Sequence, residues 1–180
     1  MTFVCLGWGS LIWDETRAAE LPTRGDWRTD GPSLPIEFAR ISSDRRLTLV
    51  ITPDAKRVPV LWAVLDVDSM KDAVALLARR EGSRGGKPTP ESNIGRYPGG
   101  DASPEAVEIG AWHSDRGFAG VVWTALRPNF PDRPCGVPLL SDVQAHLASL
   151  SGTAAACAQN YIQNAPAQIE TEFRAAIMIA

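Results

Sequence analysis

Two short segments of the sequence contain groups that could do chemistry. The first, Gly7-Trp8-Gly9-Ser10-Leu11, directly follows a short apolar run near the start of the chain. Two glycines on either side of one residue allow a sharp turn and bring bare backbone N–H groups close to a ligand. Successive N–H groups of this kind can bind an anion, most simply a carboxylate. The alternative interpretation is a turn with a structural role only.

The second segment is the end of a helix expected over residues 69–81, where Glu81 ends an apolar stripe. The other members of this stripe, spaced as one helix face requires, are Met70, Val74 and Leu77. Burial and the negative end of the helix dipole both predict a raised pKa for the Glu81 carboxyl. Such a glutamate suits general acid–base catalysis. The alternative is a side chain that reaches solvent or pairs with Arg84.

Other reactive side chains carry weaker signals. Cys5 lies within the apolar run and is expected to be an inert core residue. Ser10 could act as a nucleophile, but no motif links it to a histidine base. The chain has only three cysteines and two histidines, in no ligand-like spacing, so neither a disulfide framework nor a structural metal site is expected. The role of Tyr97 is left open.

The strands that would position these segments are expected mainly in antiparallel pairs. One hairpin is predicted over Ile36–Ile41 and Arg46–Thr52, and a second over Ala106–Trp112 and Phe118–Leu126. A further strand is expected over residues 58–67. Paired strands of this kind favour an α+β fold over a doubly wound sheet.

Helices and loops complete the expected order of elements. Ser69 is a plausible N-cap and Gly82 a plausible stop for the helix that carries Glu81. Further helices are expected from about residue 139: near 140–150, near 153–163, and one with Pro166 in its first turn. Residues 14–35 read as loop. Residues 83–105 are rich in glycine and proline and predict a long loop, such as a lid or binding segment.

Length and charge limit the function classes. The 180 residues predict a single domain over 1–180. The net charge of −3, with both signs mixed along the chain, argues against a general nucleic-acid or anionic-membrane binder. No apolar run is long enough for a membrane span, and the start has no basic region typical of a signal peptide. A cytoplasmic protein is therefore expected; the oligomeric state stays open.

Together the two segments resemble the γ-glutamylcyclotransferase superfamily. Residues 6–11, LGWGSL, are similar to the family's opening FGYGSL, and residues 78–82, ARREG, are similar to the helix end that carries the family's catalytic glutamate. Residues 60–65, VLWAVL, stand where the family has the strand before that helix. The resemblance covers about residues 3–126. Residues 160–162, NYI, are also similar to a segment of the bacterial glutathione-degrading branch.

The chain departs from the family pattern at three places. Trp8 replaces the usual tyrosine of the binding loop, and Trp62 stands where the preceding strand usually has a glycine. The tyrosine that often follows the catalytic glutamate is absent, and the first tyrosine of the chain is Tyr97. Substrate choice is therefore the least defined property.

The resemblance implies a fold, a reaction and a site. The fold would be a small mixed or antiparallel β-barrel flanked by helices. Glu81 would catalyse the attack of a γ-glutamyl compound's own α-amine on its γ-carbonyl, which releases 5-oxoproline and an amine; the Gly7–Leu11 segment would bind this small-molecule substrate. No cofactor or metal is needed. The alternatives are a non-catalytic carboxylate-binding protein on the same fold and an amide hydrolase.

Overall fold

The computed structural model describes residues 1–82, 87–100 and 103–178, and the chain divides into two compact units. Unit 1 consists of Met1–Gly7, Asp14–Pro32 and Pro59–Ala125. Unit 2 consists of Trp8–Trp13, Ser33–Val58 and Leu126–Ala180. The expectation of one domain over residues 1–180 stays a prediction, because compact units of one chain can fold together or separately.

A four-stranded mixed sheet forms the centre of unit 1, with strand order β5-β1-β7-β6. Its strands are β1 (Phe3–Gly7), β5 (Leu61–Val64), β6 (Ile94–Tyr97) and β7 (Gly120–Thr124). β1 pairs in parallel with β7 and antiparallel with β5, and β6 is antiparallel to β7. Every residue of β1 is buried, as expected for an apolar run in the middle of a sheet.

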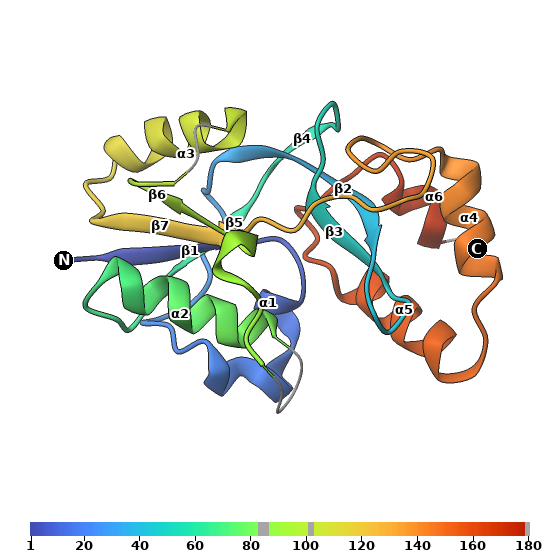
Figure 1. Ribbon diagram of the computed structural model, residues 1–180, viewed down its shortest axis with the longest axis horizontal. Coiled ribbons are helices and arrows are strands. Elements are labelled where there is room, and N and C mark those ends of the chain that lie inside the picture. Colours follow the sequence, from blue (N-terminus) through green and yellow to red (C-terminus); the bar gives the residue numbers. More distant parts are fainter. Residues whose placement is uncertain (83–86, 101–102, 179–180) are drawn as a thin grey trace. The chain divides into compact units, whose positions relative to one another are not determined.

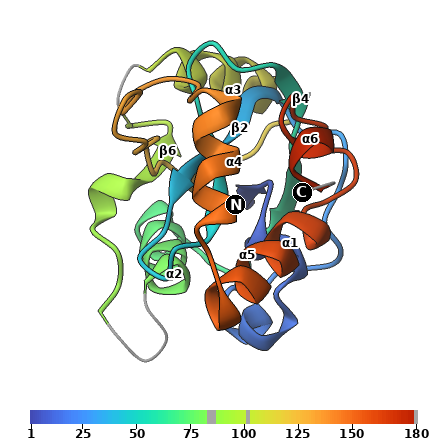
Figure 2. The same ribbon diagram turned by 90° about the vertical axis from the view of Figure 1, so that its right-hand side faces the viewer.

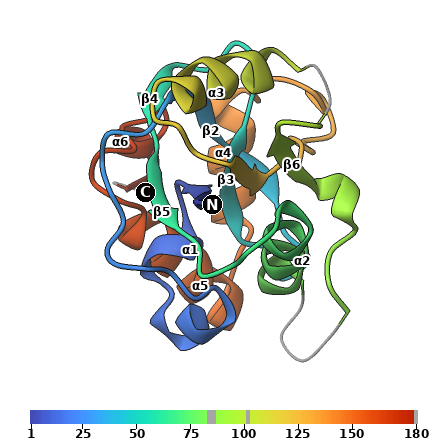
Figure 3. The ribbon, with the colours of Figure 1, turned by 90° about the vertical axis from the view of Figure 1, so that its left-hand side faces the viewer.

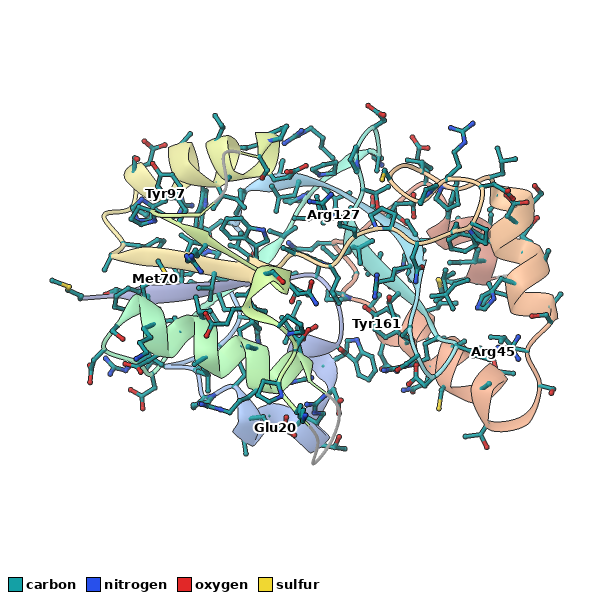
Figure 4. The ribbon with its side chains drawn as sticks, viewed as in Figure 1. Glu20, Arg45, Met70, Tyr97, Arg127 and Tyr161 are labelled. Carbon is teal, nitrogen blue, oxygen red and sulfur yellow. The ribbon has the colours of Figure 1, made fainter. Side chains whose placement is uncertain are left out.

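The helices α2 (Met70–Glu81) and α3 (Pro104–Ser114) lie on opposite faces of this sheet (Figures 1 and 3). A Cβ on Gly120 would overlap Met70, which begins α2 and is labelled in Figure 4. On the other face, a Cβ on Gly110 of α3 would lie 2.7 Å from the ring of Tyr97. Both glycines therefore let a helix approach the sheet closely. Two short 3₁₀ helices, η1 (Glu15–Glu20) and η2 (Glu91–Asn93), also belong to unit 1.

The predicted helix with Glu81 at its end is confirmed, together with its two caps. The Ser69 hydroxyl accepts a hydrogen bond from the Asp72 N–H at 3.1 Å. At the other end, the Gly82 N–H donates to the Ala78 carbonyl at 3.1 Å. These bonds satisfy backbone groups that lack a partner at helix ends, so the local sequence fixes both limits of α2.

Unit 2 contains a three-stranded sheet, order β3-β2-β4, and four helices. The strands are β2 (Ser33–Ile41), β3 (Leu47–Ile51) and β4 (Arg57–Pro59). The helices are α1 (Ser10–Trp13), α4 (Leu140–Ala148), α5 (Gly152–Asn164) and α6 (Arg174–Met178), the last three of which face the viewer in Figure 2. β2 and β3 are antiparallel, so the first predicted hairpin is confirmed.

The α+β class is confirmed, but the expected closed barrel is wrong. In the described residues the strands form two separate sheets, of four and three strands. The expected strand over residues 58–67 is broken at Val60, so that β4 joins one sheet and β5 the other. Val60 is the break because its N–H donates to the Pro32 carbonyl at 3.0 Å instead of continuing a ladder. The chain therefore changes sheet where a barrel would need continuous pairing.

Three local predictions are also wrong. Ala106–Trp112 is part of α3 and not a strand, because Ser103 caps the helix and Pro104 occupies its first turn. The expected loops contain regular structure: η1 lies within 14–35, and η2 and β6 lie within 83–105, of which 83–86 and 101–102 are outside the described residues. No helix begins at Pro166; α6 begins only at Arg174. Among the described residues, no helix has the length and apolar character needed to cross a membrane.

A buried carboxyl group in unit 2 joins β2 to the segment before α6. Glu37 is 1% exposed. It accepts the Phe38 N–H at 2.8 Å and the Phe173 N–H at 3.3 Å, one on each oxygen. Burial raises the pKa of Glu37, and the nearby Thr171 hydroxyl and these N–H groups only partly oppose it. The Thr171 effect is a weak contact, since its hydroxyl makes no well-formed hydrogen bond within the described residues.

This buried group predicts a pH dependence of stability. Because the native pKa of Glu37 is raised, the folded chain holds this proton more tightly than the unfolded chain does. The free energy of unfolding should therefore fall as pH rises from the ordinary glutamate value through the raised native value. Urea unfolding across this pH range should show that the parent loses stability relative to Glu37→Gln, because glutamine has no such proton. A difference independent of pH, or an equal effect in the exposed control Glu172→Gln, would contradict the prediction.

Candidate active site

Glu81 lies at the carboxyl ends of the two parallel strands of unit 1. The helix α2 begins with Met70 beside Gly120, which is the first residue of β7. It ends with Glu81, whose charge acts on Cys5, the middle residue of β1, and in Figure 1 both elements run from the left of the view toward its centre. The helix therefore runs in the same direction as β1 and β7. The carboxyl edge of parallel strands is where α/β sheets commonly bind ligands.

Charged side chains of η1 and α2 interact electrostatically with Glu81. Arg80 is 3% exposed and its Nη2 lies 3.8 Å from Asp14 Oδ2. Arg17 pairs with Glu20 at 2.6 Å. The Glu20 hydrogen bond raises the pKa of Arg17, and the charge of Glu81 adds to this effect. Burial lowers the pKa of Arg80, and the charge of Glu81 only partly opposes this lowering. Positive charge beside Glu81 is a feature that sequence reasoning missed, and the expected raised titration of Glu81 stays a prediction.

The surroundings of Cys5 agree with the expectation that it is an inert core residue. The thiol has no exposed surface, and burial, together with the negative charge of Glu81, raises the pKa of Cys5. Arg80 acts in the opposite direction but more weakly. A thiol in this environment stays protonated and is a poor nucleophile.

Thr124 is a polar residue at the same strand edge that sequence reasoning missed. Alternation along β7 places Thr124 on the face of Gly120, which is the face covered by α2. The Thr124 hydroxyl is buried and has no hydrogen-bond partner in the described part of the chain. Because buried hydroxyls are usually paired, Thr124 is a candidate ligand contact. The alternation of side chains along the strand 120–124 was the sequence signal that could have indicated the position of Thr124.

The glycine segment leaves β1 and enters unit 2. Gly7 is the last residue of β1, and Ser10 and Leu11 begin α1. Trp8 is 5% exposed, and its indole N–H donates to the Leu49 carbonyl at 3.2 Å. Its ring is therefore mainly a core group of unit 2. Trp8–Leu11 belong to unit 2 and Glu81 to unit 1, so a shared pocket stays a prediction.

Gly9 is held against a tyrosine from the C-terminal part of the chain. A Cβ on Gly9 would overlap the Tyr161 hydroxyl, which accepts the Leu49 N–H at 3.4 Å. The Tyr161 ring is packed edge-on against Trp13, with centroids 5.8 Å apart, and the Arg46 guanidinium lies 5.8 Å from its centre. A hydroxyl group thus lies at the glycine segment although Trp8 supplies none. The only sequence signal for Tyr161 was the short resemblance of residues 160–162.

This packing predicts an energetic coupling between Gly9 and Tyr161. Gly9→Ala should cost about 1–3 kcal/mol of unfolding free energy, because the new methyl group overlaps a buried hydroxyl. Tyr161→Phe removes that oxygen, so the double variant should be more stable than the sum of the two single costs predicts. Chemical denaturation of the four proteins measures the coupling. Gly136→Ala is the control, since a Cβ there meets open space. Simple additivity would contradict the packing account.

Trp62 stands where the family strand has glycine, and it is packed inside unit 1. It is 2% exposed, and its indole N–H donates to Asp30 Oδ1 at 2.8 Å. Trp112 and Phe118 contact the ring at centroid distances of 5.6 and 5.0 Å. The Arg28 guanidinium covers it at 4.6 Å. Groups of the chain itself therefore occupy the space around this indole.

Comparison with known proteins gives no relative for this chain. Neither a scan of protein-family models nor searches of curated proteins and of solved structures found a match. Within residues 1–82, 87–100 and 103–178, no group of three or more His, Cys, Asp or Glu side chains is arranged to hold a metal ion. The motifs and the geometry of each unit therefore remain as the signs of function.

Proposed function

We propose that this chain is a γ-glutamylcyclotransferase-like enzyme, which cleaves a γ-glutamyl amide to 5-oxoproline and a free amine. The placement of Glu81 is the observation that carries the proposal. It lies at the end of α2, at the carboxyl edge of β1 and β7, and β1 leads directly into the glycine segment. A carboxyl group and an N–H-rich turn on neighbouring strand and helix ends are the two parts this reaction needs.

The reaction is an intramolecular acyl transfer. The neutral α-amine of the substrate attacks its own γ-carbonyl carbon, a C–N bond closes the five-membered ring, and the carbonyl oxygen becomes an oxyanion. The C–N bond to the leaving amine then breaks as the carbonyl re-forms. Glu81 takes the proton released by the attacking nitrogen and passes it to the leaving nitrogen, so no net proton is consumed. Because the nucleophile is already tethered, the protein mainly supplies orientation.

The remaining residues of the site would bind and orient. The N–H groups of Gly7–Leu11 would hold the substrate carboxylate or the oxyanion, which needs donors fixed in advance. Thr124 offers a hydroxyl at the edge where Glu81 lies. The described cysteines are free, in line with a reducing compartment, so we place the reaction in the cytoplasm.

A panel of γ-glutamyl dipeptides and γ-glutamyl alkylamines tests this function. Each compound is paired with its Nα-acetyl derivative, whose nitrogen cannot attack. We expect equimolar 5-oxoproline and amine from some free-amine members and no turnover of the acetylated partners. Cleavage of the acetylated compounds to N-acetylglutamate would indicate an amide hydrolase instead. Saturable binding of the compounds without turnover would indicate a carboxylate-binding protein.

A further inference from the structure

Arg17 links η1 to the end of α2. Its Nη2 donates to the Gly82 carbonyl at 3.1 Å, and its Nε and Nη2 donate to the Glu20 carboxylate at 2.6–3.0 Å. The Arg17 side chain is 12% exposed; its bond to Gly82 is partly buried, whereas its bonds to Glu20 are exposed. Gly82 directly follows Glu81, and carbonyls at a helix end lack partners within the helix. Arg17 therefore fixes the backbone next to the Glu81 side chain.

The same guanidinium acts electrostatically on Glu81. The Glu20 hydrogen bond is the main cause of the raised pKa of Arg17, and the charges of Glu81 and Asp14 add to it. Glu20 holds the guanidinium in one orientation through two parallel bonds, which a lysine could not reproduce. The guanidinium is consequently held in one place by Glu20 and by the Gly82 carbonyl. Arg17 thus bonds to the backbone next to Glu81 and also interacts electrostatically with the Glu81 side chain.

Arg80 approaches Glu81 from α2 itself. It is nearly fully buried, and its Nη2 lies 3.8 Å from Oδ2 of Asp14, the residue before η1. Arg17, in contrast, reaches the helix end from η1 and bonds to its backbone. In the described part of the chain, the charged and titratable groups that interact with Glu81 or its arginines come from β1, η1, the residue before η1, and α2. They include Cys5, Asp14, Arg17, Glu20 and Arg80.

We propose that Arg17 is a positioning residue, which holds the last turn of α2 so that the Glu81 carboxylate meets the substrate in one fixed arrangement. This inference rests on the proposed function for its catalytic meaning. It extends that function to a residue of η1 that touches no part of the substrate. Removing Arg17 should loosen Glu81 and remove a cation from its side, so that kcat falls while KM changes little.

Two variants and two independent measurements test this role. Arg17→Met removes the charge and the hydrogen bonds, whereas Arg17→Lys keeps the charge and loses the two-pronged geometry. We expect kcat to fall about tenfold or more in Arg17→Met, and less in Arg17→Lys, because misplaced catalytic groups react slowly. The control is Arg24→Met, which breaks the exposed Arg24–Asp66 pair of the same unit and should leave kcat unchanged.

The second measurement does not depend on turnover. NMR titration of ¹³C-labelled glutamate should move the Glu81 titration to higher pH in Arg17→Met, because loss of a cation disfavours the charged carboxylate. The acid limb of the rate–pH profile should move in the same direction. If the parent is inactive on every γ-glutamyl compound, the proposed function is wrong. The NMR titration then still tests whether Arg17 acts on Glu81. If the Glu81 titration of both folded variants equals that of the parent, Arg17 does not position Glu81.

Discussion

Replacing Glu81 with glutamine should slow the reaction by about a hundredfold or more and leave the fold intact. Glutamine has nearly the same shape, so the end of α2 and its caps at Ser69 and Gly82 should not change. The amide cannot take the proton from the attacking amine, so the loss should fall on kcat. KM should change little, because in the proposed function the ground state is bound by the N–H groups of Gly7–Leu11 and not by Glu81.

Steady-state kinetics on one substrate of the panel measures this effect. Circular dichroism and the thermal unfolding midpoint establish that the variant is folded. Glu91→Gln is the matched control, since Glu91 is an exposed glutamate of unit 1. If Glu81→Gln turns over substrate as fast as the parent, Glu81 is not the acid–base group, and the ligand-binding alternative becomes the better reading of the glycine segment.

Replacing Trp62 with alanine should cost about 3–5 kcal/mol of unfolding free energy, the largest stability loss that we expect in unit 1. The indole is buried at 2% exposure between Trp112 and Phe118, so its removal leaves a cavity that a β-strand cannot close. The variant also loses the hydrogen bond to Asp30 and the stacking of Arg28.

Trp62→Phe separates the two contributions. It keeps an aromatic ring and loses the N–H, so urea unfolding should give a smaller cost of about 1–2 kcal/mol. A near-neutral Trp62→Ala would mean that the aromatic cluster does not pack as described.

Local signals predicted the parts of the fold that depend on neighbouring residues. Ser69 and Gly82 fixed the limits of α2, and the hairpin β2–β3 followed from two β-rich runs on either side of a turn. The helix α3 was missed because its buried face contains few large apolar residues: Ala106, Ile109 and Gly110 give a weak hydrophobic period. The break at Val60 could not be foreseen, because the Pro32 carbonyl that pairs with it is distant in sequence.

The candidate site was predictable to the same degree. The position of Glu81 at a helix end followed from spacing and capping within α2 itself. Its charged surroundings did not, because Arg17 lies in a segment without period that folds as the short helix η1. Tyr161 was similarly hidden, since its contact with Gly9 joins residues more than a hundred positions apart. Contacts of this range are made by tertiary packing and not by local pattern.

Product analysis in ¹⁸O-labelled water tests the central claim most directly. Intramolecular attack forms a C–N bond and admits no water oxygen, so mass spectrometry should find unlabelled 5-oxoproline in an amount equal to the released amine. The Glu81→Gln variant should form about a hundredfold less of it. Glutamate carrying one ¹⁸O atom in its γ-carboxyl group would show that water is the nucleophile, and would contradict the cyclotransferase account.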